Sequence, residues 1–277
     1  MPELEFDDII RAALREDMPE GDITSESIIP AGAVSAAILL AKEEGVLAGL
    51  PVARRVFEII DRGIDFHSEF MDGQAVKKDD VLARMNGPTV SLLKAERTAL
   101  NFLQRLSGIA TATRRFVDAA AGTKARILDT RKTTPGLRLL EKYAVRMGGG
   151  TNHRLGLSDM VLIKDNHLRH VGSIGEAVRR ARAKVPPTIK IEVEVTSLGE
   201  LREALAAGAD IVMLDNMSLD KTKEAVSLCA GRVPLEVSGK VTLERVREIA
   251  VAGVDYISVG ALTHSARALD ISLEFVS

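Results

Sequence analysis

The sequence predicts an α/β protein with an N-terminal α+β domain at residues 1–112 and an α/β barrel domain at residues 113–277. From about residue 125, short apolar runs alternate with helical patterns, which indicates a parallel sheet. A weak repeat supports this reading, because AGADIV at residues 207–212 is echoed by AGVDYI at residues 252–257. The sequence has no Gly-x-Gly-x-x-Gly fingerprint, which favours a barrel over a dinucleotide-binding sheet.

The first domain mixes helical and strand-like segments. Apolar spacing predicts helices at residues 6–15, 51–60 and 95–106, and a turn-rich connector is expected at residues 17–25. Strands are expected at residues 34–42, 45–49, 66–72, 81–85 and 89–93, with turns at 72–73, 78–80 and 86–88. The C-terminal end of the chain can also return to this domain as a last strand or helix.

The barrel domain has six apolar runs that read as strands. They lie at residues 125–128, 160–163, 189–195, 210–214, 235–237 and 255–259, and helices are expected at 174–184, 198–207, 219–229 and 243–252. The carboxyl ends of barrel strands carry the active site. Here all six ends are polar or glycine-containing: Asp129-Thr130-Arg131-Lys132, Lys164-Asp165-Asn166-His167, Thr196-Ser197, Asp215-Asn216, Ser238-Gly239-Lys240 and Gly260-Ala261.

Composition excludes several classes of function. Lys and Arg (37) nearly balance Asp and Glu (39), and aromatic residues make up only 3%, which disfavours a nucleic-acid partner. The single cysteine, Cys229, excludes an intrachain disulfide and a cysteine-based zinc site. Apolar runs fall short of the ~18 residues that a membrane span needs, and residues 1–5 lack a signal peptide's basic start. We therefore expect a cytoplasmic protein without a membrane partner.

Cations are concentrated in residues 126–169, which hold nine Lys or Arg and four Asp or Glu. A solvated helical face explains part of this set, because Arg138, Lys142 and Arg146 have helical spacing. Four of the other cations lie at strand ends or beside glycine, where a ligand with several carboxylates or phosphates would bind. They are Arg131, Lys132, Arg154 and Lys164.

The acidic residues suggest a metal. Glu192 and Glu194 alternate with apolar residues, so both point to one face of a strand, and Asp215 ends the next strand. Glu194 and Asp215 make a plausible Mg²⁺ site, because Mg²⁺ prefers one or two carboxylates with waters and phosphate oxygens. The alternative is ion pairing with Lys132 or Lys164.

Glycine-containing segments suggest phosphate binding. Ser238-Gly239-Lys240 and Val259-Gly260-Ala261 follow the last two strands, where barrels often bind phosphate through backbone N–H groups. A third run, GGG at residues 148–150, is followed by His153 and Arg154. It indicates a close backbone approach, a mobile lid or a simple flexible turn.

Together these motifs resemble quinolinate phosphoribosyltransferase, also called nicotinate-nucleotide pyrophosphorylase (carboxylating). The match runs nearly the whole chain in order. Its segments are GDIT at 21–24, ERTALN at 96–101, SGIAT at 107–111, TRKTTPG at 130–136, GGGTNHR at 148–154, IKDNH at 163–167, EVEV at 192–195, LDN at 214–216 and GALTH at 260–264.

The resemblance implies an α/β domain packed on an incomplete barrel of about six strands. It implies transfer of phosphoribosyl from phosphoribosyl pyrophosphate to quinolinate, with decarboxylation to nicotinate mononucleotide, pyrophosphate and CO₂ in de novo NAD synthesis. It also implies a homodimer in which Arg97 reaches the neighbouring subunit's site, and an association of such dimers into a hexamer.

The resemblance also assigns roles to residues. Arg131, His153, Arg154 and Lys164 would bind the quinolinate carboxylates. Lys132, Glu194 and Asp215 would be the catalytic residues that hold phosphoribosyl pyrophosphate, the two acids with Mg²⁺. The remaining substrate-binding residues, which include the cradle of the 5′-phosphate, would be Thr130, Ser238, Gly239, Lys240, Val259, Gly260 and Ala261.

Lys240 departs from the family pattern, which usually has a second glycine there. If this position needs a positive φ, lysine is modestly strained, and its ammonium group can add a phosphate contact instead. Two other functions stay open at this point. One is a Schiff-base aldolase with Lys132 or Lys164 as nucleophile. The other is a non-catalytic paralogue associated with molybdenum transport, which lacks the run kept here at residues 164–167.

Overall fold

The computed structural model describes residues 6–276, so residues 1–5 and Ser277 lie outside the described residues. The chain forms two compact units. Unit 1 takes in the chain up to Arg114, Thr134–Gly149 and the residues from Ser265 onward, and unit 2 takes in Arg115–Thr133 and Gly150–His264. These units differ from the ranges 1–112 and 113–277 at residues 134–149, which belong to unit 1. The C-terminal end also belongs to unit 1, a return to the first domain that the sequence allowed.

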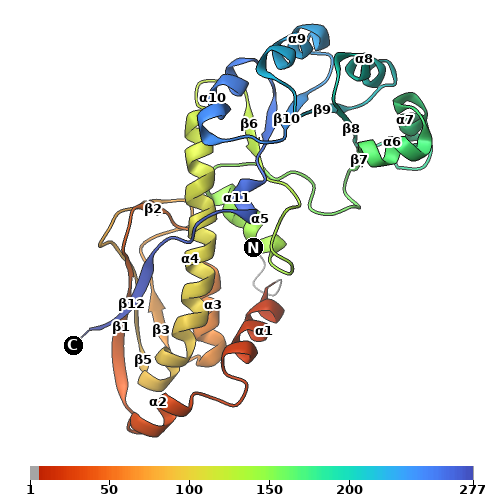
Figure 1. Ribbon diagram of the computed structural model, residues 1–277. Coiled ribbons are helices and arrows are strands. Elements are labelled where there is room, and N and C mark those ends of the chain that lie inside the picture. Colours follow the sequence, from red (N-terminus) through yellow and green to blue (C-terminus); the bar gives the residue numbers. More distant parts are fainter. Residues whose placement is uncertain (1–5, 277) are drawn as a thin grey trace. The chain divides into compact units, whose positions relative to one another are not determined.

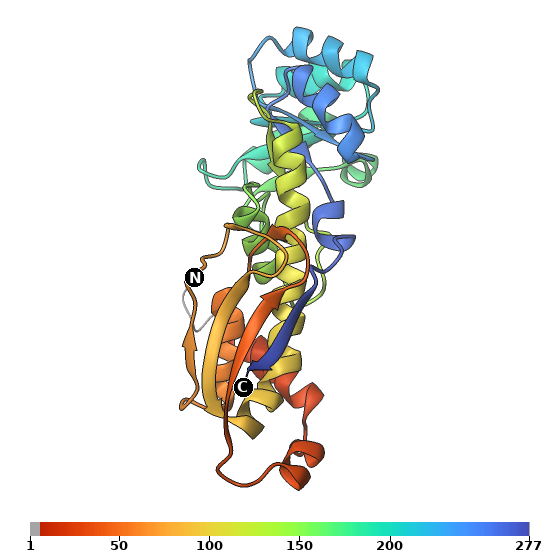
Figure 2. The same ribbon diagram turned by 90° about the vertical axis from the view of Figure 1, so that its left-hand side faces the viewer.

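Unit 1 is built on an antiparallel sheet of order β12-β1-β5-β3. Figure 2 shows β12, in blue, beside β1, in orange, so segments from opposite ends of the chain are paired. A small second sheet joins β2 and β4. The strands are β1 (Val34–Ala41), β2 (Gly45–Val46), β3 (Asp65–His67), β4 (Ala75–Val76), β5 (Val81–Pro88) and β12 (Ile271–Val276).

The helices of unit 1 include a long one, α4, that begins where a strand was expected. The predicted turn at 86–88 and strand at 89–93 are wrong, because residues 86–88 pair with β1 and extend β5. Leu92, Ala95 and Ala99 are fully buried at helical spacing, so the apolar residues after Pro88 form a helix face. The helices are α1 (Asp7–Asp17), α2 (Ile23–Ile28), α3 (Leu50–Ile60), α4 (Thr89–Ala119) and α5 (Arg138–Met147).

Two other local predictions need correction. The expected connector at residues 17–25 ends inside α2, because the Asp22 carboxylate accepts a hydrogen bond from Ser25 N at 3.0 Å and caps that helix. The expected strand at residues 66–72 stops at His67. Beyond it, Asp72 turns back and accepts hydrogen bonds from the backbone N–H groups of Gly49 and Leu50 at the start of α3.

Helix α5 carries Arg138, Lys142 and Arg146, which were expected to form a solvated basic face, but one of the three is buried. Arg146 is exposed, but Lys142 is only 2% exposed. Just beyond α5, Gly148 lies so close to Ala110 and Thr113 of α4 that a side chain would collide with them. A close backbone approach therefore accounts for the first glycine of the 148–150 run.

Unit 2 contains a six-stranded parallel sheet of order β6-β11-β10-β9-β8-β7 (Figure 1). No pairing joins β6 to β7 in the described part of the chain, so the barrel is incomplete. The predicted α/β class and the count of six strands are confirmed. The strands are β6 (Arg126–Leu128), β7 (Val161–Ile163), β8 (Ile191–Val195), β9 (Ile211–Asp215), β10 (Leu235–Ser238) and β11 (Tyr256–Ser258).

Helices alternate with these strands as expected. Two short helices were not predicted, α6 (Asp165–Val171) and α11 (Ala261–His264), because neither is long enough to show an apolar stripe. The predicted helices appear as α7 (Ile174–Arg182), α8 (Leu198–Ala206), α9 (Leu219–Cys229) and α10 (Leu243–Val251). None of the helices in residues 6–276 is long and apolar enough to cross a membrane.

Candidate active site

A cavity of about 480 Å³ opens at the carboxyl ends of the unit 2 strands. Five of its lining residues are Lys or Arg, although the whole chain has a net charge of −2. The cavity therefore suits an anionic ligand. It is lined by Thr130, Arg131, Lys132, His153, Arg154, Leu162, Lys164, Glu194, Met213, Asp215, Asn216, Glu236, Ser238, Gly239, Lys240 and Ser258.

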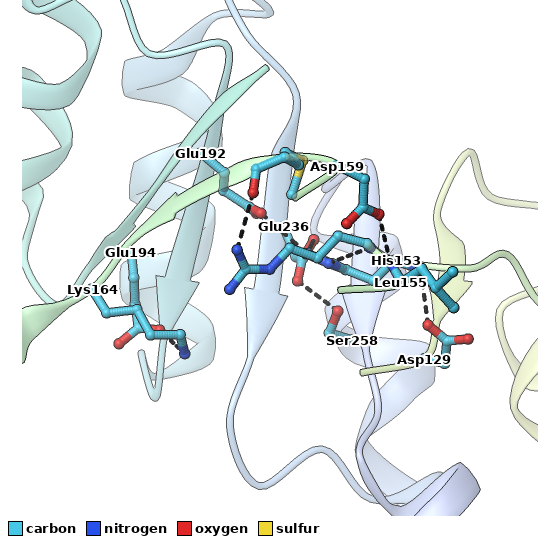
Figure 3. Close-up of polar contacts among 11 residues, drawn as sticks. Asp129, His153, Leu155, Asp159, Lys164, Glu192, Glu194, Glu236 and Ser258 are labelled. Atoms are coloured by element: carbon cyan, nitrogen blue, oxygen red, sulfur yellow. Dashed lines mark hydrogen bonds and ion pairs between the residues drawn. The ribbon is translucent and has the colours of Figure 1, made fainter. Parts of the chain in front are cut away.

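Asp129 anchors the segment that brings His153 to the cavity. It follows β6 directly and is fully buried. Its two carboxylate oxygens accept hydrogen bonds from His153 N at 2.9 Å and from Asn152 Nδ2 at 2.6 Å. Thr151 N–H also donates to Ile127 O at 2.8 Å, so this segment lies alongside β6. A charged acceptor thus holds the loop that carries His153 and Arg154 (Figure 3).

The His153 ring lies over two buried acids. Nε2 is 3.1 Å from Glu192 Oε2 and 3.5 Å from Glu236 Oε2 (Figure 3). Glu236 Oε1 also accepts a 2.5 Å hydrogen bond from the Ser258 hydroxyl. Glu192 Oε1 is buried without a hydrogen-bond partner. The strand periodicity correctly placed Glu192 inside the sheet, but Glu236, on β10, was missed. Its signal is the same alternation, because Leu235 and Val237 flank it as apolar residues flank Glu192.

These contacts set the ring's protonation. Arg154 N–H donates to His153 Nδ1 at 2.8 Å, which places the ring hydrogen of the neutral form on Nε2, facing the acids. Burial disfavours charge on the ring, but the hydrogen bonds with Glu192 and Glu236 outweigh it and raise the pKa of His153 to about 9. Burial likewise raises the pKa of the Glu192 carboxyl to about 7. A second ring proton would therefore displace the Arg154 contact rather than the acids.

The cations of the cavity are held individually. Lys164 Nζ forms a 2.8 Å ion pair with Glu194, so the predicted alternative of pairing with Lys164 is confirmed for Glu194 (Figure 3). The Arg154 guanidinium donates to Met160 O at 3.0 Å. Burial and the nearby Arg131 charge both lower the pKa of Arg154. Two guanidinium groups that repel each other would gain from an anion between them.

The other strand ends present turns rather than paired charges. Asp215 ends β9, and its Oδ2 accepts a 2.8 Å hydrogen bond from Asn216 Nδ2. Gly239 and Lys240 follow β10 with φ values of 93° and 49°. The condition for strain at Lys240 is thus met, because the lysine occupies a conformation that favours glycine. Lys132 O accepts a 2.8 Å hydrogen bond from the Thr263 hydroxyl.

Some predicted residues lie outside the cavity lining. Arg97 is an exposed residue of α4 in unit 1, and Val259 is buried behind the end of β11. Gly260 and Ala261 lie at the start of α11. Gly260 nonetheless borders the Lys132 side chain, since a Cβ there would lie 3.2 Å from Lys132 Cδ and 3.2 Å from His264 Nε2.

Sequence reasoning did not assign site roles to several residues that the structure brings to the cavity or beneath it. Asn216 and Asp129 stood in strand-end motifs but were given no function. Leu162, Met213 and Ser258 lie inside apolar strands, where pattern alone does not tell a core residue from a cavity residue. These side chains supply an apolar floor and a hydroxyl group among the charges.

The metal prediction was compared with the available donors. Across the described residues, one group of three side chains places possible metal-ligand atoms within 4.8 Å of one another: His153, Glu192 and Glu236. Glu194 and Asp215 are separate from it, line the cavity from adjacent strands and supply only oxygen, which Mg²⁺ prefers. The residues present therefore fit Mg²⁺, and the site at Glu194 and Asp215 stays a prediction.

Comparisons with known proteins match this architecture. The model of the quinolinate phosphoribosyl transferase C-terminal domain matches residues 109–274, and that of the N-terminal domain matches residues 22–107. The chain belongs to the quinolinate phosphoribosyltransferase family. This confirms the resemblance inferred from the motifs.

Curated relatives and solved structures of the family agree along the full chain. The probable nicotinate-nucleotide pyrophosphorylase (carboxylating) of Bacillus subtilis is 44% identical over 274 residues, covering 99% of this chain and 94% of the relative. The nicotinate-nucleotide pyrophosphorylase (carboxylating) of Mycobacterium leprae is 46% identical, covering 99% of both chains. The crystal structure of NadC from Streptococcus pyogenes has a TM-score of 0.96 at 45% identity and covers 100% of this chain and 99% of that one.

Proposed function

We propose that this chain transfers phosphoribosyl from phosphoribosyl pyrophosphate to quinolinate and releases pyrophosphate and CO₂, with the unit 2 cavity as its active site. The carrying observation is that one cavity combines clustered side-chain cations with glycine-containing strand ends. Its volume of about 480 Å³ lies within the range of small-molecule sites. Relatives in the family are named for this activity.

Quinolinate binds at the cationic side. Arg131, Arg154 and Lys164 provide three positive charges for two carboxylates, and His153 forms the wall between them and the buried acids. Repulsion between Arg131 and Arg154 is relieved when a dianion lies near both. A guanidinium group can grip a carboxylate through two parallel hydrogen bonds, which orients the pyridine ring as well as binding it.

Phosphoribosyl pyrophosphate binds on the other side of the cavity, also at carboxyl ends of the strands. Backbone N–H groups at residues 238–241 and 259–261 contact the 5′-phosphate, and Lys132 and Lys240 add positive charge. Glu194 and Asp215 would hold Mg²⁺, which would neutralise charge on the pyrophosphate leaving group. Thr130 helps to fix the backbone at Lys132, because the Thr130 hydroxyl oxygen accepts a hydrogen bond from Lys132 N at 3.1 Å.

The reaction follows from this arrangement. The pyridine nitrogen bonds to ribose C1 as the bond from C1 to pyrophosphate oxygen breaks, and Lys132 stabilises the charge that builds on the leaving group. A carboxylate of Glu194 or Asp215 stabilises the positive sugar centre. The ring nitrogen is then cationic, so the bond to the adjacent carboxylate breaks with its electron pair left on C2. CO₂ departs, and a proton from solvent adds to C2.

An aldolase function is less well supported by the geometry. A Schiff-base lysine needs an amine with its lone pair available, whereas Lys164 is engaged as a cation by Glu194 at 2.8 Å. The arginines around the cavity likewise suit anions better than an aldehyde. The run at residues 164–167, which the accessory paralogue lacks, argues against the accessory function, and turnover tests it directly.

The proposal extends to assembly and location. The chain acts as a homodimer in which Arg97, exposed on α4, reaches the cavity of the partner subunit, and dimers associate into a hexamer. The cytoplasm stays the predicted location, because a chain with a single cysteine suits a reducing compartment. The mass of the assembly in solution, compared between the wild type and an Arg97→Glu variant, tests the dimer contact.

The activity test uses the purified chain with phosphoribosyl pyrophosphate, Mg²⁺ and either quinolinate or nicotinate. The expected result is CO₂ and nicotinate mononucleotide from quinolinate, no mononucleotide from nicotinate, and loss of the reaction with EDTA. Absence of turnover with either acid would contradict the proposed function and favour the accessory-protein reading.

A further inference from the structure

The ends of strands β9 and β10 interlock through Asn216. Four non-glycine residues in residues 6–276 have a positive φ, and two of them, Asn216 at 52° and Lys240 at 49°, lie at these neighbouring strand ends. Left-handed backbone in non-glycine residues persists only where surrounding contacts hold it. Both residues line the cavity. The contacts of Asn216 therefore shape this part of the cavity.

Asn216 makes three separate contacts. Its backbone N–H donates to Ser238 O at 2.9 Å, which ties the end of β9 to the end of β10. Its side-chain Nδ2 donates to Asp215 Oδ2 at 2.8 Å. Its amide group also lies against Gly239, so closely that any Cβ on residue 239 would overlap with it. One residue thus touches the acid and the glycine loop assigned to the phosphoribosyl ligand.

The amide is well matched to this position. Asparagine adopts the left-handed region more readily than most residues, so the positive φ of residue 216 costs little free energy. The Nδ2 group is neutral, so it fixes one carboxylate oxygen without cancelling the negative charge of Asp215. A lysine or arginine there would neutralise that charge and compete with a cation for it.

We infer that Asn216 is a positioning residue that aligns the Asp215 carboxylate with the Ser238-Gly239-Lys240 turn for phosphoribosyl pyrophosphate. The inference rests on the proposed function for the identity of that ligand. Asn216 acts through its neighbours: the amide orients Asp215, and the same amide fills the space above Gly239 so that the turn keeps its shape. Residue 239 must then be glycine, because a side chain there would collide with the Asn216 amide.

The test uses Asn216→Gly, because glycine accepts a φ of 52° without strain and removes only the amide. Folding is therefore preserved, and the midpoint of thermal unfolding is expected at or above that of the wild type. A hydrogen bond to a charged acceptor is lost, so the affinity for phosphoribosyl pyrophosphate with Mg²⁺, measured by calorimetry, should fall about ten- to a hundredfold. The KM for quinolinate should stay within about twofold, because distant contacts are independent.

A matched control isolates the effect of backbone relief. Ala230 has a φ of 50° at the end of α9, outside the cavity lining, so Ala230→Gly makes the same backbone change without touching the site. It should leave both substrate constants unchanged. A second variant, Asn216→Asp, keeps the size of the side chain but sets a carboxylate beside Asp215, and should weaken phosphoribosyl pyrophosphate binding at least as much as Asn216→Gly.

Each outcome decides between the claims. Weaker phosphoribosyl pyrophosphate binding in both Asn216 variants, with the quinolinate KM and thermal midpoint retained, supports the inference. Wild-type affinity in Asn216→Gly, or an equal loss for both substrates, overturns it. A wild-type chain that binds phosphoribosyl pyrophosphate but does not turn over refutes only the proposed reaction. A wild-type chain that does not bind it overturns both claims.

Discussion

The two sides of the cavity are built in different ways. On one side, which we call the charged side, His153, Arg154 and Lys164 are each held by a protein partner: buried acids, a backbone carbonyl and Glu194. On the other, the turn side, Asn216 at the end of β9 and the residues after β10 rely on backbone conformation, with a positive φ at Asn216, Gly239 and Lys240.

The proposed function relates this difference to the chemistry of each ligand. A planar dicarboxylate presents two fixed charges, which rigid side-chain cations can match in both position and orientation. A phosphate presents oxygens in all directions, which several backbone N–H groups of a turn can surround. Changes on the charged side should therefore act on quinolinate, and changes on the turn side on phosphoribosyl pyrophosphate.

The largest effect is expected at Lys132, which the proposed function places at the pyrophosphate leaving group. Lys132→Ala should lower kcat about 10²- to 10³-fold, because one positive group aimed at the leaving pyrophosphate is lost in the transition state. The KM for quinolinate should change little. Steady-state kinetics check this, with Lys184→Ala, an exposed lysine just beyond α7, as the control. Unchanged turnover would remove Lys132 from the catalytic residues.

Arg154→Lys should raise the KM for quinolinate about ten- to a hundredfold, since lysine keeps the charge but loses the paired hydrogen bonds of guanidinium. The KM for phosphoribosyl pyrophosphate should be retained. Arg169→Lys on exposed α6 provides the control, because the same exchange there touches no cavity residue. An equal rise in both KM values would mean that Arg154 does not belong to one side.

The buried acids predict a pH dependence of stability. The pKa of His153 is raised from 6.5 to about 9 in the folded chain, so its stabilising contribution is complete below pH 6.5 and is lost as the pH rises through 9. Glu192, raised to about 7, acts in the same direction but at lower pH. The free energy of unfolding should therefore fall by about 1–3 kcal/mol between pH 7 and 9.

Urea unfolding at several pH values measures this loss, with His153→Gln as the comparison. The variant lacks the titrating ring, so its stability should vary less over the same interval. A wild-type stability that rises between pH 7 and 9 would show that the ring is not stabilised in its protonated form by Glu192 and Glu236.

The smallest effect is expected at Lys240. Lys240→Gly should raise the free energy of unfolding by about 1 kcal/mol, because glycine adopts a φ of 49° without strain. The same change removes an ammonium group from the turn side, so the KM for phosphoribosyl pyrophosphate should rise a few-fold, roughly threefold for an exposed charge. Thermal unfolding and kinetics on one preparation check both signs. A more stable variant with unchanged KM would leave Lys240 without a phosphate contact.

Much of unit 2 could be predicted because its signals are local. The polar strand ends and the pair Glu192 and Glu194 on one strand face follow from the alternation of apolar and polar residues. The failures involve distance. Pro88 was read as the end of a turn, but pairing of residues 86–88 with β1 keeps them in a strand. No spacing rule indicates that buried Lys142 leaves the solvated face.

The site shows the same limit. Glu236 lies 44 residues from Glu192 in sequence, yet both face the His153 ring because parallel strands bring their alternating residues to one interior. Asn216 carries no signal of its own, since its role depends on the space above Gly239, which only the folded chain reveals. Residue type and spacing predicted the charges that line the cavity, whereas the residues that position them needed the structure.

The most direct test of the two-sided cavity compares both KM values in one variant from each side. Arg154→Lys alters the charged side. Gly239→Ala alters the turn side, because the new methyl group meets the Asn216 amide at a φ of 93°. Arg154→Lys should raise only the KM for quinolinate, and Gly239→Ala should raise only the KM for phosphoribosyl pyrophosphate. A parallel rise of both constants in both variants would contradict the two-sided cavity.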